Sequence, residues 1–286
     1  MNSVKVTFMM LGLIALFVAV GYSAGGQSGM VMAFVFASIM NFLAYWFSDK
    51  VVLAMYRARR VNESDHPKLF RVVRRVVQQA MMPTMPAVYI VPTRAPNAFA
   101  TGRSLDHAAV AVSEGLLELL TEDELEGVIG HEIAHIQNKD MLVGTIAATF
   151  AGAIGILASI ARWGAIFGGG GGRDDNRGGA IGLLVAAFLA PIVAMIIQMA
   201  ISRQREYKAD AESGRVTGKY LSLASALEKL HRSPIRMNLD DRPATAHLMI
   251  ANPLSGKSFT TLFSTHPPVE ERISRLRQMA QMPHHG

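Results

Sequence analysis

Hydrophobic residues dominate the N-terminal part of the chain, where residues 6–48 contain no charged side chain. This run is about twice as long as the ~20 residues that one membrane-spanning helix needs, and a polar, glycine-rich stretch at 21–29 interrupts it. The pattern predicts a transmembrane hairpin at 6–47, built of two helices over roughly Val6–Val20 and Met30–Phe47. A cleavable signal peptide is the alternative for the first helix, and it fits poorly because a second apolar segment follows at once.

A second pair of apolar segments lies in the middle of the chain. Residues 141–161 and 178–202 carry no charge, and a polar loop at 168–177, which begins with a run of glycines, separates them. The pattern predicts a second hydrophobic hairpin at 141–202. Its segments are rich in alanine and glycine, which allow helices to pack closely in a membrane. They are less hydrophobic than the first pair, so the sequence leaves open whether they cross the bilayer completely.

The polar portions carry the periodicities of ordinary helices and strands. Apolar residues recur at helical spacing over Pro67–Ala80 and predict a helix there. Short runs of small and β-branched residues predict strands at Ala87–Val91 and Ala108–Val112. Thr121, with Glu124 three residues later, is typical of a capping box that begins a further helix. The expected fold is therefore mainly α with a small β-sheet.

Composition and charge favour a multi-pass membrane protein whose polar portions, 48–140 and 203–286, form one cytoplasmic domain. Hydrophobic residues make up 50% of the chain and the mean hydropathy is +0.26, which is high for a soluble domain. The net charge of +6 would suggest nucleic acid in a soluble protein. Here the cations follow the second apolar segment, which favours an anionic membrane surface and no nucleic acid. These cations are Arg57, Arg59, Arg60, Lys68, Arg71, Arg74 and Arg75. The positive-inside rule then places both termini in the cytoplasm.

A metal-binding motif lies in the helix that Thr121 begins. The chain contains no cysteine, so a metal site must use His, Asp or Glu. His131, Glu132 and His135 form the pattern HExxH, which puts both imidazoles on one face of the helix, where they can hold one Zn²⁺. Glu132 lies beside the metal and can accept a proton from water. The alternative is a chance match on a surface helix, which the capped and amphipathic context disfavours.

A catalytic zinc site needs a third protein ligand. No further histidine follows within the next dozen residues, and the best carboxylate is Glu206, directly after the second apolar pair. Asp210 stands four residues on and can orient a ligand imidazole, and Arg203 is expected to support the same site. The alternative is a solvated helix start in which Arg203 pairs with Glu206.

The chain resembles the superfamily of membrane zinc peptidases that includes the CAAX prenyl endopeptidases. The likeness rests on the HEIAH helix, on residues 203–210 and on Thr265-His266-Pro267-Pro268 followed by Glu271 and Arg272, together with Asn97–Gly102 and the two hydrophobic pairs. It implies a gluzincin-like, zinc-dependent endopeptidase with one Zn²⁺ held by His131, His135 and Glu206. It also implies a bacterial inner membrane, a site at the cytoplasmic face, and a stress role in degrading damaged membrane proteins, with cytosolic proteins as a further substrate class.

Two flanking pieces are expected to contact the substrate. Asn97, Ala98, Phe99 and Ala100 lie between prolines and a glycine, as in an edge strand that could pair with an extended polypeptide. The alternative is a loop in which Phe99 fills the core. His266 precedes two prolines and could donate to the oxyanion that develops on the scissile carbonyl, although a surface histidine is the commoner outcome. With Glu132, we expect Asn97 and His266 to act in catalysis.

Two other functions remain as alternatives. A membrane scaffold or chaperone could keep the zinc for stability alone, but the presence of Glu132 counts against it. A metal transporter would place its site near the middle of the bilayer, whereas His131 and His135 precede the third apolar segment. The sequence therefore favours peptide hydrolysis.

Overall fold

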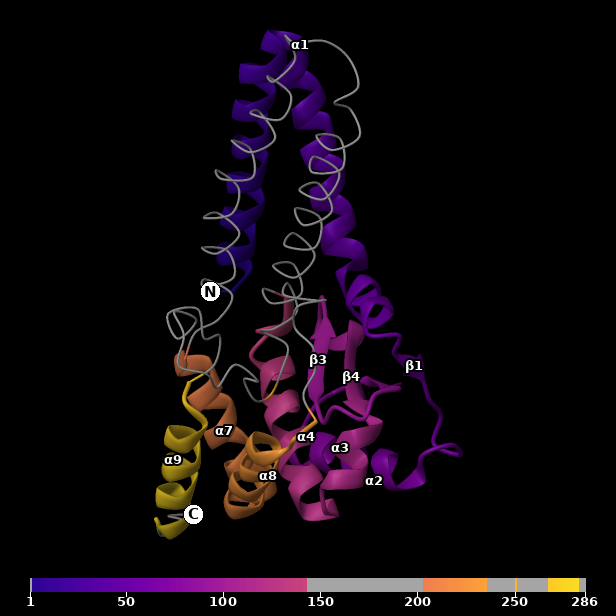
Figure 1. Ribbon diagram of the computed structural model, residues 1–286, viewed down its shortest axis with the longest axis vertical. Coiled ribbons are helices and arrows are strands. Elements are labelled where there is room, and N and C mark those ends of the chain that lie inside the picture. Colours follow the sequence, from indigo (N-terminus) through magenta and orange to yellow (C-terminus); the bar gives the residue numbers. More distant parts are fainter. Residues whose placement is uncertain (1, 143–202, 236–249, 251–266, 283–286) are drawn as a thin grey trace.

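A long helical hairpin stands above a compact mixed domain in the computed structural model, which describes residues 2–142, 203–235, 250 and 267–282 (Figure 1). The predicted second hydrophobic hairpin lies almost entirely outside the described residues, as does His266. The described part is mostly helical with one small sheet, so the prediction of fold class is confirmed at that level.

The hairpin is the helix α1, Asn2–Met55, whose two arms meet at Gly25 and Gly26. Gly26 has φ +61° and ψ −144°, a conformation that is essentially reserved for glycine. Sequence reasoning expected a polar turn of nine residues at 21–29, but the chain stays helical on both sides of these two glycines. A Cβ on Gly21 would lie 2.5 Å from the Gly29 carbonyl oxygen. Glycine therefore lets the two arms approach closely beside the turn.

The second arm of α1 is the described helix that is long and apolar enough to cross a membrane. Its apolar stretch covers Gly25–Phe47, with a mean hydropathy of 1.8, whereas the first arm has a shorter apolar stretch at Val6–Ala19. The lower end of α1 is anchored in the domain below it, because Val52 and Tyr56, the residue that follows α1, are buried against the sheet. The helix and the sheet are thus joined by a packed apolar contact.

The sheet has four strands in the order β1-β2-β4-β3. Their bounds are Arg59–Arg60 for β1, Ala87–Val91 for β2, Ala98–Gly102 for β3 and Ala108–Ser113 for β4. β2 and β4 pair in parallel, with Val88 opposite Val110, and β3 pairs antiparallel to β4. β3 is consequently an edge strand of the sheet, and it begins one residue after Asn97.

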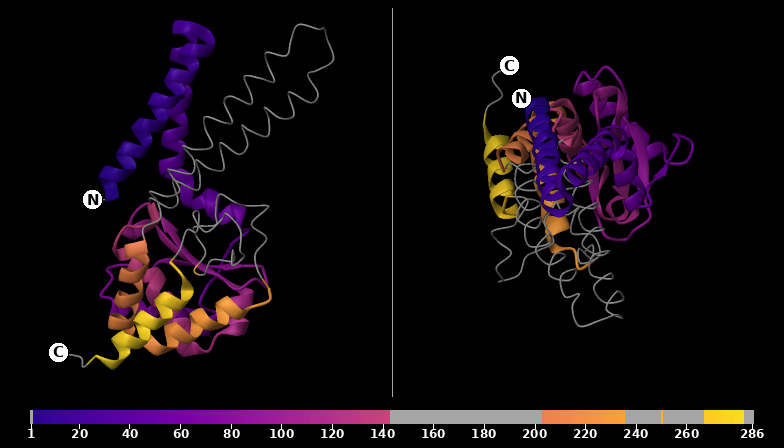
Figure 2. Two further views of the ribbon diagram at one scale, coloured as in Figure 1. Left: turned by 60° about the vertical axis from the view of Figure 1, so that its left-hand side comes forward. Right: turned by 90° about the horizontal axis from the view of Figure 1, so that it is seen from above.

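Most of the helices surround α4, Glu122–Gln137 (Figure 1). α2 (Pro67–Gln79) and β3 pack on one side of it, and α7 (Arg203–Thr217) and α8 (Tyr220–Arg232) pack on the other. α9, Val269–Gln281, lies along α7 and α8 (Figure 2). Two short elements, the 3-10 helix η1 (Leu105–His107) and α3 (Glu114–Leu119), flank β4. The helix α4 is therefore the centre of the domain.

The predicted helices form for the reasons that the sequence indicates. α2 buries its whole apolar stripe, which consists of Leu69, Val72, Val73, Val76 and Val77. The predicted capping box begins α4: the Glu124 N–H donates to Thr121 Oγ1 at 3.3 Å, and the Thr121 N–H donates to Glu124 Oε2 at 2.8 Å. Lys229 of α8 also donates to Glu124 Oε2 at 2.7 Å. The cap therefore fixes the start of α4 and its position against α8 together.

Candidate metal centre and active site

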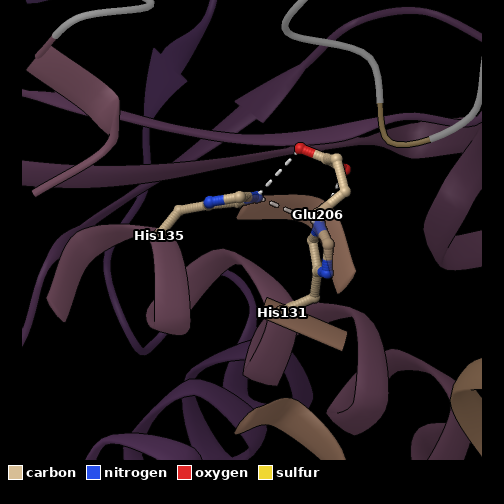
Figure 3. A group of neighbouring side chains, drawn as sticks. All are labelled: His131, His135 and Glu206. Atoms are coloured by element: carbon tan, nitrogen blue, oxygen red, sulfur yellow. Dashed lines mark hydrogen bonds and ion pairs between the residues drawn. The ribbon is translucent and has the colours of Figure 1, made fainter. Parts of the chain in front are cut away.

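Two histidines of α4 meet a glutamate of α7 that lies some seventy residues later in the sequence (Figure 3). His131 and His135 lie one turn apart on α4, and their Nε2 atoms are 3.1 Å from each other. Glu206, in the first turn of α7, places one carboxylate oxygen 3.6 Å from His131 Nε2 and the other 3.5 Å from His135 Nε2. The three ligand atoms of this cluster lie within 4.8 Å of one another.

The close approach of α7 to α4 beside His131 depends on a glycine. A Cβ on Gly130 would come within 2.6 Å of Ser213 Oγ, so glycine allows the two helices to touch there. Ser213 in turn donates to the Gly127 carbonyl at 2.7 Å. The buried stripe of α7 is partly polar and turns towards α4; it consists of Glu206, Ala209, Asp210, Ser213, Gly214 and Thr217. This packing brings Glu206 to the two histidines.

The spacing of the cluster fits a zinc ion. Ligand atoms that are ~2.0–2.2 Å from a tetrahedral zinc stand ~3.3–3.6 Å from one another, and the three measured separations are 3.1, 3.6 and 3.5 Å. Two imidazoles and one carboxylate are also a common ligand set of catalytic zinc. His131, His135 and Glu206 could therefore hold one Zn²⁺ without rearrangement of the two helices.

A buried ion pair of Asp210 and Arg272 contacts His131 on the ring nitrogen that faces away from the cluster. His131 Nδ1 lies 2.9 Å from Asp210 Oδ1, and the histidine is only 1% exposed. Asp210 also accepts two hydrogen bonds of 2.7 Å from Arg272 of α9, which is completely buried. Burial opposes ionisation of Asp210, but Arg272 outweighs it and lowers the pKa of Asp210 to about 2. The carboxylate is therefore charged, and it fixes the ring so that Nε2 faces Glu206.

His135 has a similar but looser arrangement. Its Nδ1 lies 3.4 Å from Asp140 Oδ2, and its side chain is 16% exposed. Arg205 lies 3.6 Å from the other oxygen of Asp140. Burial disfavours protonation of His135, yet Asp140 and Glu206 together raise its pKa in the metal-free protein to about 10. Each candidate zinc histidine thus turns its Nδ1 towards an aspartate and its Nε2 towards the cluster.

Glu132 lies next to the cluster with 4% of its surface exposed. Burial raises the pKa of its carboxyl group, against the opposing influence of His131 and His135 and a backbone hydrogen bond from Ala100. A buried carboxylate of raised pKa beside a metal site is suited to accept and return a proton. The contact with Ala100 also connects Glu132 to the edge strand β3.

The residues of the expected substrate strand lie beside Glu132, and all four are buried. The Asn97 N–H donates to Ser113 Oγ at 2.8 Å, and its carbonyl accepts from the Ser113 N–H at 2.9 Å. Phe99 packs on Tyr56, the residue after α1, with ring centroids 4.8 Å apart. Its side chain fills the core, as in the alternative interpretation, but the segment is a strand and no loop. Ala98 and Ala100 belong to the main core. Their side chains fill the interior, so contact with a substrate would fall to the backbone of β3 and to Asn97.

Arg203, which the sequence predicts to support the ligands, and Arg205 lie differently with respect to the cluster. Arg203 is exposed at the first residue of α7, and the cation that contacts Asp140 is Arg205, one half-turn further along the helix. Helical periodicity explains the difference, because Arg203 and Arg205 point to different sides of α7.

Sequence reasoning assigned no role to Arg272 or Asp140. A signal for Arg272 was available, since it occupies one position of the apolar stripe of α9, with Val269, Ile273 and Leu276 at helical spacing around it. A charge in such a stripe indicates a buried ion pair. Asp140 carries no comparable signal, because it follows the C-terminal end of α4 in a polar stretch.

Comparisons with known proteins give the family of this chain. The pattern of Peptidase family M48 matches residues 63–280. A protein named Protease HtpX homolog from Desulfatibacillum aliphaticivorans is 54% identical over 276 residues, which cover 96% of this chain and 89% of that protein. Proteins of the same name from Syntrophobacter fumaroxidans and Thermococcus sibiricus are 53% and 52% identical, and the matches cover 96% of this chain and 98% and 94% of those proteins.

The fold also resembles that of a solved structure with a much lower sequence identity. The crystal structure of Ste24p from S. mikatae matches with a TM-score of 0.51 and 18% identity, over 96% of this chain and 64% of the Ste24p chain. The motifs of this chain resemble those of the protease HtpX within the membrane zinc peptidases, and this resemblance is confirmed. The chain belongs to peptidase family M48, a family of metalloproteases.

Proposed function

We propose that the protein is a membrane-integrated, zinc-dependent endopeptidase that hydrolyses peptide bonds at the cytoplasmic face of a bacterial inner membrane. The observation that carries this proposal is the convergence of His131, His135 and Glu206 beside the buried Glu132. Its substrates would be mainly membrane proteins, with cytosolic proteins as a further class, and its role would be the removal of damaged membrane proteins. Membership of the M48 family supports the class of reaction.

Glu132 is the residue that moves protons in this proposal. Bound zinc would supply Lewis acidity, which makes water acidic near neutral pH and polarises a carbonyl group. Glu132 accepts the proton that water loses as it attacks the scissile carbonyl carbon, and it then gives that proton to the nitrogen of the leaving amine as the C–N bond breaks. The place of Glu132 beside the cluster suits both steps, because the group must be a base and then an acid.

Substrate binding is proposed at the edge strand β3 and at Asn97. An extended polypeptide would add to the sheet through backbone hydrogen bonds, which give affinity with little dependence on side chains. Among the described residues, Asn97 Nδ2 has no hydrogen-bond partner although Asn97 is only 5% exposed. A buried donor of this kind can bind the carbonyl oxygen of a substrate. His266 remains a proposed second donor.

The decisive experiment uses Glu132→Gln, with Glu126→Gln as the matched control. Both glutamates are buried on α4, but Glu126 pairs with Arg75 at 2.8 Å on another face of the helix. The full chain is purified in mild detergent, its zinc is measured, and digestion of fluorescent casein is followed with and without a chelator. We expect Glu132→Gln to keep its zinc and lose ~10²–10⁴-fold in turnover, and Glu126→Gln to remain active. Proteolysis at the wild-type rate in Glu132→Gln would overturn the proposal.

The proposed orientation has its own test, which the absence of cysteine makes simple. Ser28 lies beside the turn of α1, Ser64 lies in the domain below, and both are exposed. Ser28→Cys and Ser64→Cys are labelled in intact spheroplasts with a maleimide that does not cross membranes. We expect label on Ser28→Cys, and label on Ser64→Cys after lysis. The opposite pattern would place the peptidase domain outside the cell.

A further inference from the structure

Arg272 faces the metal cluster on one side and the backbone of Ile250 on the other. On the side of the cluster its Nη2 lies 3.4 Å from His131 Nδ1, and its Nη1 lies 3.7 Å from Glu206 Oε2. Its Nε and Nη2 atoms each donate to Asp210 at 2.7 Å, and Asp210 orients His131. Its third nitrogen, Nη1, donates to the carbonyl oxygen of Ile250 at 2.7 Å. Arg272 is 0% exposed and Ile250 is 3% exposed, so this second bond is also made in a dry environment, where hydrogen bonds of a charged donor are strong.

Ile250 also contacts Asn97, the residue that precedes the proposed substrate strand β3. Its backbone N–H donates to Asn97 Oδ1 at 3.1 Å. Because this bond occupies the oxygen of the amide group, it determines which way the amide is turned and leaves Nδ2 as the free end. The backbone of Asn97 is fixed separately by its two hydrogen bonds to Ser113. The Ile250 contact therefore acts on the orientation of the amide group and has no part in holding the strand.

We propose that Arg272 is a positioning residue that orients two parts of the active site at once. Through Asp210 it fixes the zinc ligand His131. Through the peptide of Ile250 it fixes the amide of Asn97, so that Nδ2 is directed at the carbonyl oxygen of a bound polypeptide. This inference rests on the proposed function, since it assumes a substrate that Asn97 can bind.

An arginine is required for this double role. The planar guanidinium offers donors in a fixed fork, two of which match a carboxylate while a third points elsewhere, whereas the lysine ammonium is a single point of charge. In Arg272→Lys the ammonium should stay with Asp210, because a charged acceptor is favoured over a neutral carbonyl. Zinc binding should then remain within a few-fold of wild type, while the bond to Ile250 is lost. Arg272→Met removes the contacts with Asp210 and Ile250 and also the 3.7 Å ion pair with Glu206.

The first test separates zinc affinity from turnover in these two variants. Zinc affinity is measured by competition with a chelator, and kcat and KM are measured with fluorescent casein at saturating zinc. We expect Arg272→Lys to bind zinc nearly as wild type and to lose ~10–100-fold in kcat, because the donor to the substrate is misplaced. Arg272→Met should in addition lose ~10–100-fold in zinc affinity. Wild-type kcat in Arg272→Lys would overturn the inference.

The second test breaks the contact with Asn97 without touching Arg272. Ile250→Pro lacks the backbone N–H and keeps the carbonyl that Arg272 binds, while Ile250→Ala, the matched control, keeps both. We expect Ile250→Pro to have ~10-fold or more lower kcat than Ile250→Ala, with the same zinc affinity. In an Asn97→Ala background the two should turn over equally, because the amide that the N–H orients is gone.

These variants distinguish failure of the inference from failure of the proposed function. If Glu132→Gln is inactive but the effect of Ile250→Pro is equally large with and without Asn97, the function stands and the inference is wrong. If Glu132→Gln digests casein like wild type, the function itself is wrong. Should Arg272→Met not fold, as shown by its melting in detergent, the comparison of Ile250→Pro with Ile250→Ala still tests the inference.

Discussion

His131 and His135 lie one turn apart on the same helix and present Nε2 to the same point, yet the protein holds them differently. Behind His131, the bonds to Asp210 and Arg272 measure 2.9 and 2.7 Å and the residues are at most 2% exposed. Behind His135, the corresponding separations to Asp140 and Arg205 are 3.4 and 3.6 Å, and the side chains are 10–16% exposed. Short, buried, charge-assisted bonds stabilise a geometry more than long, partly wet ones.

The difference follows from the parts of the chain to which the supporting residues belong. Asp210 and Arg272 belong to α7 and α9, which pack inside the peptidase domain. Asp140 and Arg205 stand at the two ends of the apolar region 141–202. The position of His131 is therefore set by the core of the domain, whereas that of His135 is set at the boundary with the proposed second membrane hairpin. We expect mutations on the two sides to have unequal effects.

The largest effect is expected for Glu206, which contacts both histidines. Glu206→Gln replaces an anionic ligand with a neutral amide, so zinc content and proteolysis should both fall to background. Glu212→Gln is the matched control, since Glu212 lies on the same helix and pairs with Arg215 away from the cluster. Metal analysis of the purified proteins measures the outcome. Full zinc occupancy in Glu206→Gln would show that another residue is the third ligand.

Asp210→Asn should have the next largest effect. It weakens the support of His131, which should lower zinc affinity ~10–100-fold. It also leaves the charge of Arg272 buried without its carboxylate, which should destabilise the fold by ~3–5 kcal/mol. Chelator competition and thermal melting in detergent measure the two effects. A protein that melts like wild type would mean that the Arg272–Asp210 pair contributes little to the stability of the domain.

Asp140→Asn should lower zinc affinity less, by ~10-fold at most. The bond it weakens is longer than that of Asp210 and partly exposed, and its loss leaves no fully buried charge behind. Melting should change little. If Asp140→Asn loses more zinc affinity than Asp210→Asn, then His135 is held more firmly than His131, which is the reverse of what their contacts indicate.

The smallest effect is expected for Arg205. The ion pair with Asp140 is 3.6 Å long, and a pair of this kind contributes ~1 kcal/mol or less, so Arg205→Gln should change zinc affinity by less than ~5-fold. Arg203→Gln, on the exposed start of the same helix, should have no effect at all. Chelator competition on both variants decides which arginine supports the site. If Arg203→Gln lowers zinc affinity more than Arg205→Gln does, Arg203 supports the site, as the sequence predicts.

Local patterns predicted much of the fold. The stripe of α2, the strands β2 and β4 and the capping box of α4 follow from residues within one or two turns of each other, and the structure agrees with all of them. The turn of α1 was predicted too long, because polarity alone cannot distinguish a loop from a helix that carries small polar residues. Only Gly25 and Gly26 leave the helical conformation there.

The site was predictable as far as its chemistry required particular residue types. HExxH predicts two ligands and a base at fixed spacing. A catalytic zinc site needs a third ligand, and the sequence offers the carboxylate of Glu206 for it. The contacts between Arg272, Ile250 and Asn97 join residues separated by 22 and 153 positions, and a single sequence carries no signal for such pairs beyond the charge in the stripe of α9. Their partners follow from the packing of the helices.

The central claim is that His131, His135 and Glu206 hold one zinc ion. Diffraction at the zinc absorption edge from crystals of the full chain, grown with zinc, tests it most directly. The account predicts one strong anomalous peak ~2.0–2.2 Å from the Nε2 atoms of both histidines and from a carboxylate oxygen of Glu206. A zinc peak elsewhere, or one that Glu206 does not contact, would contradict it.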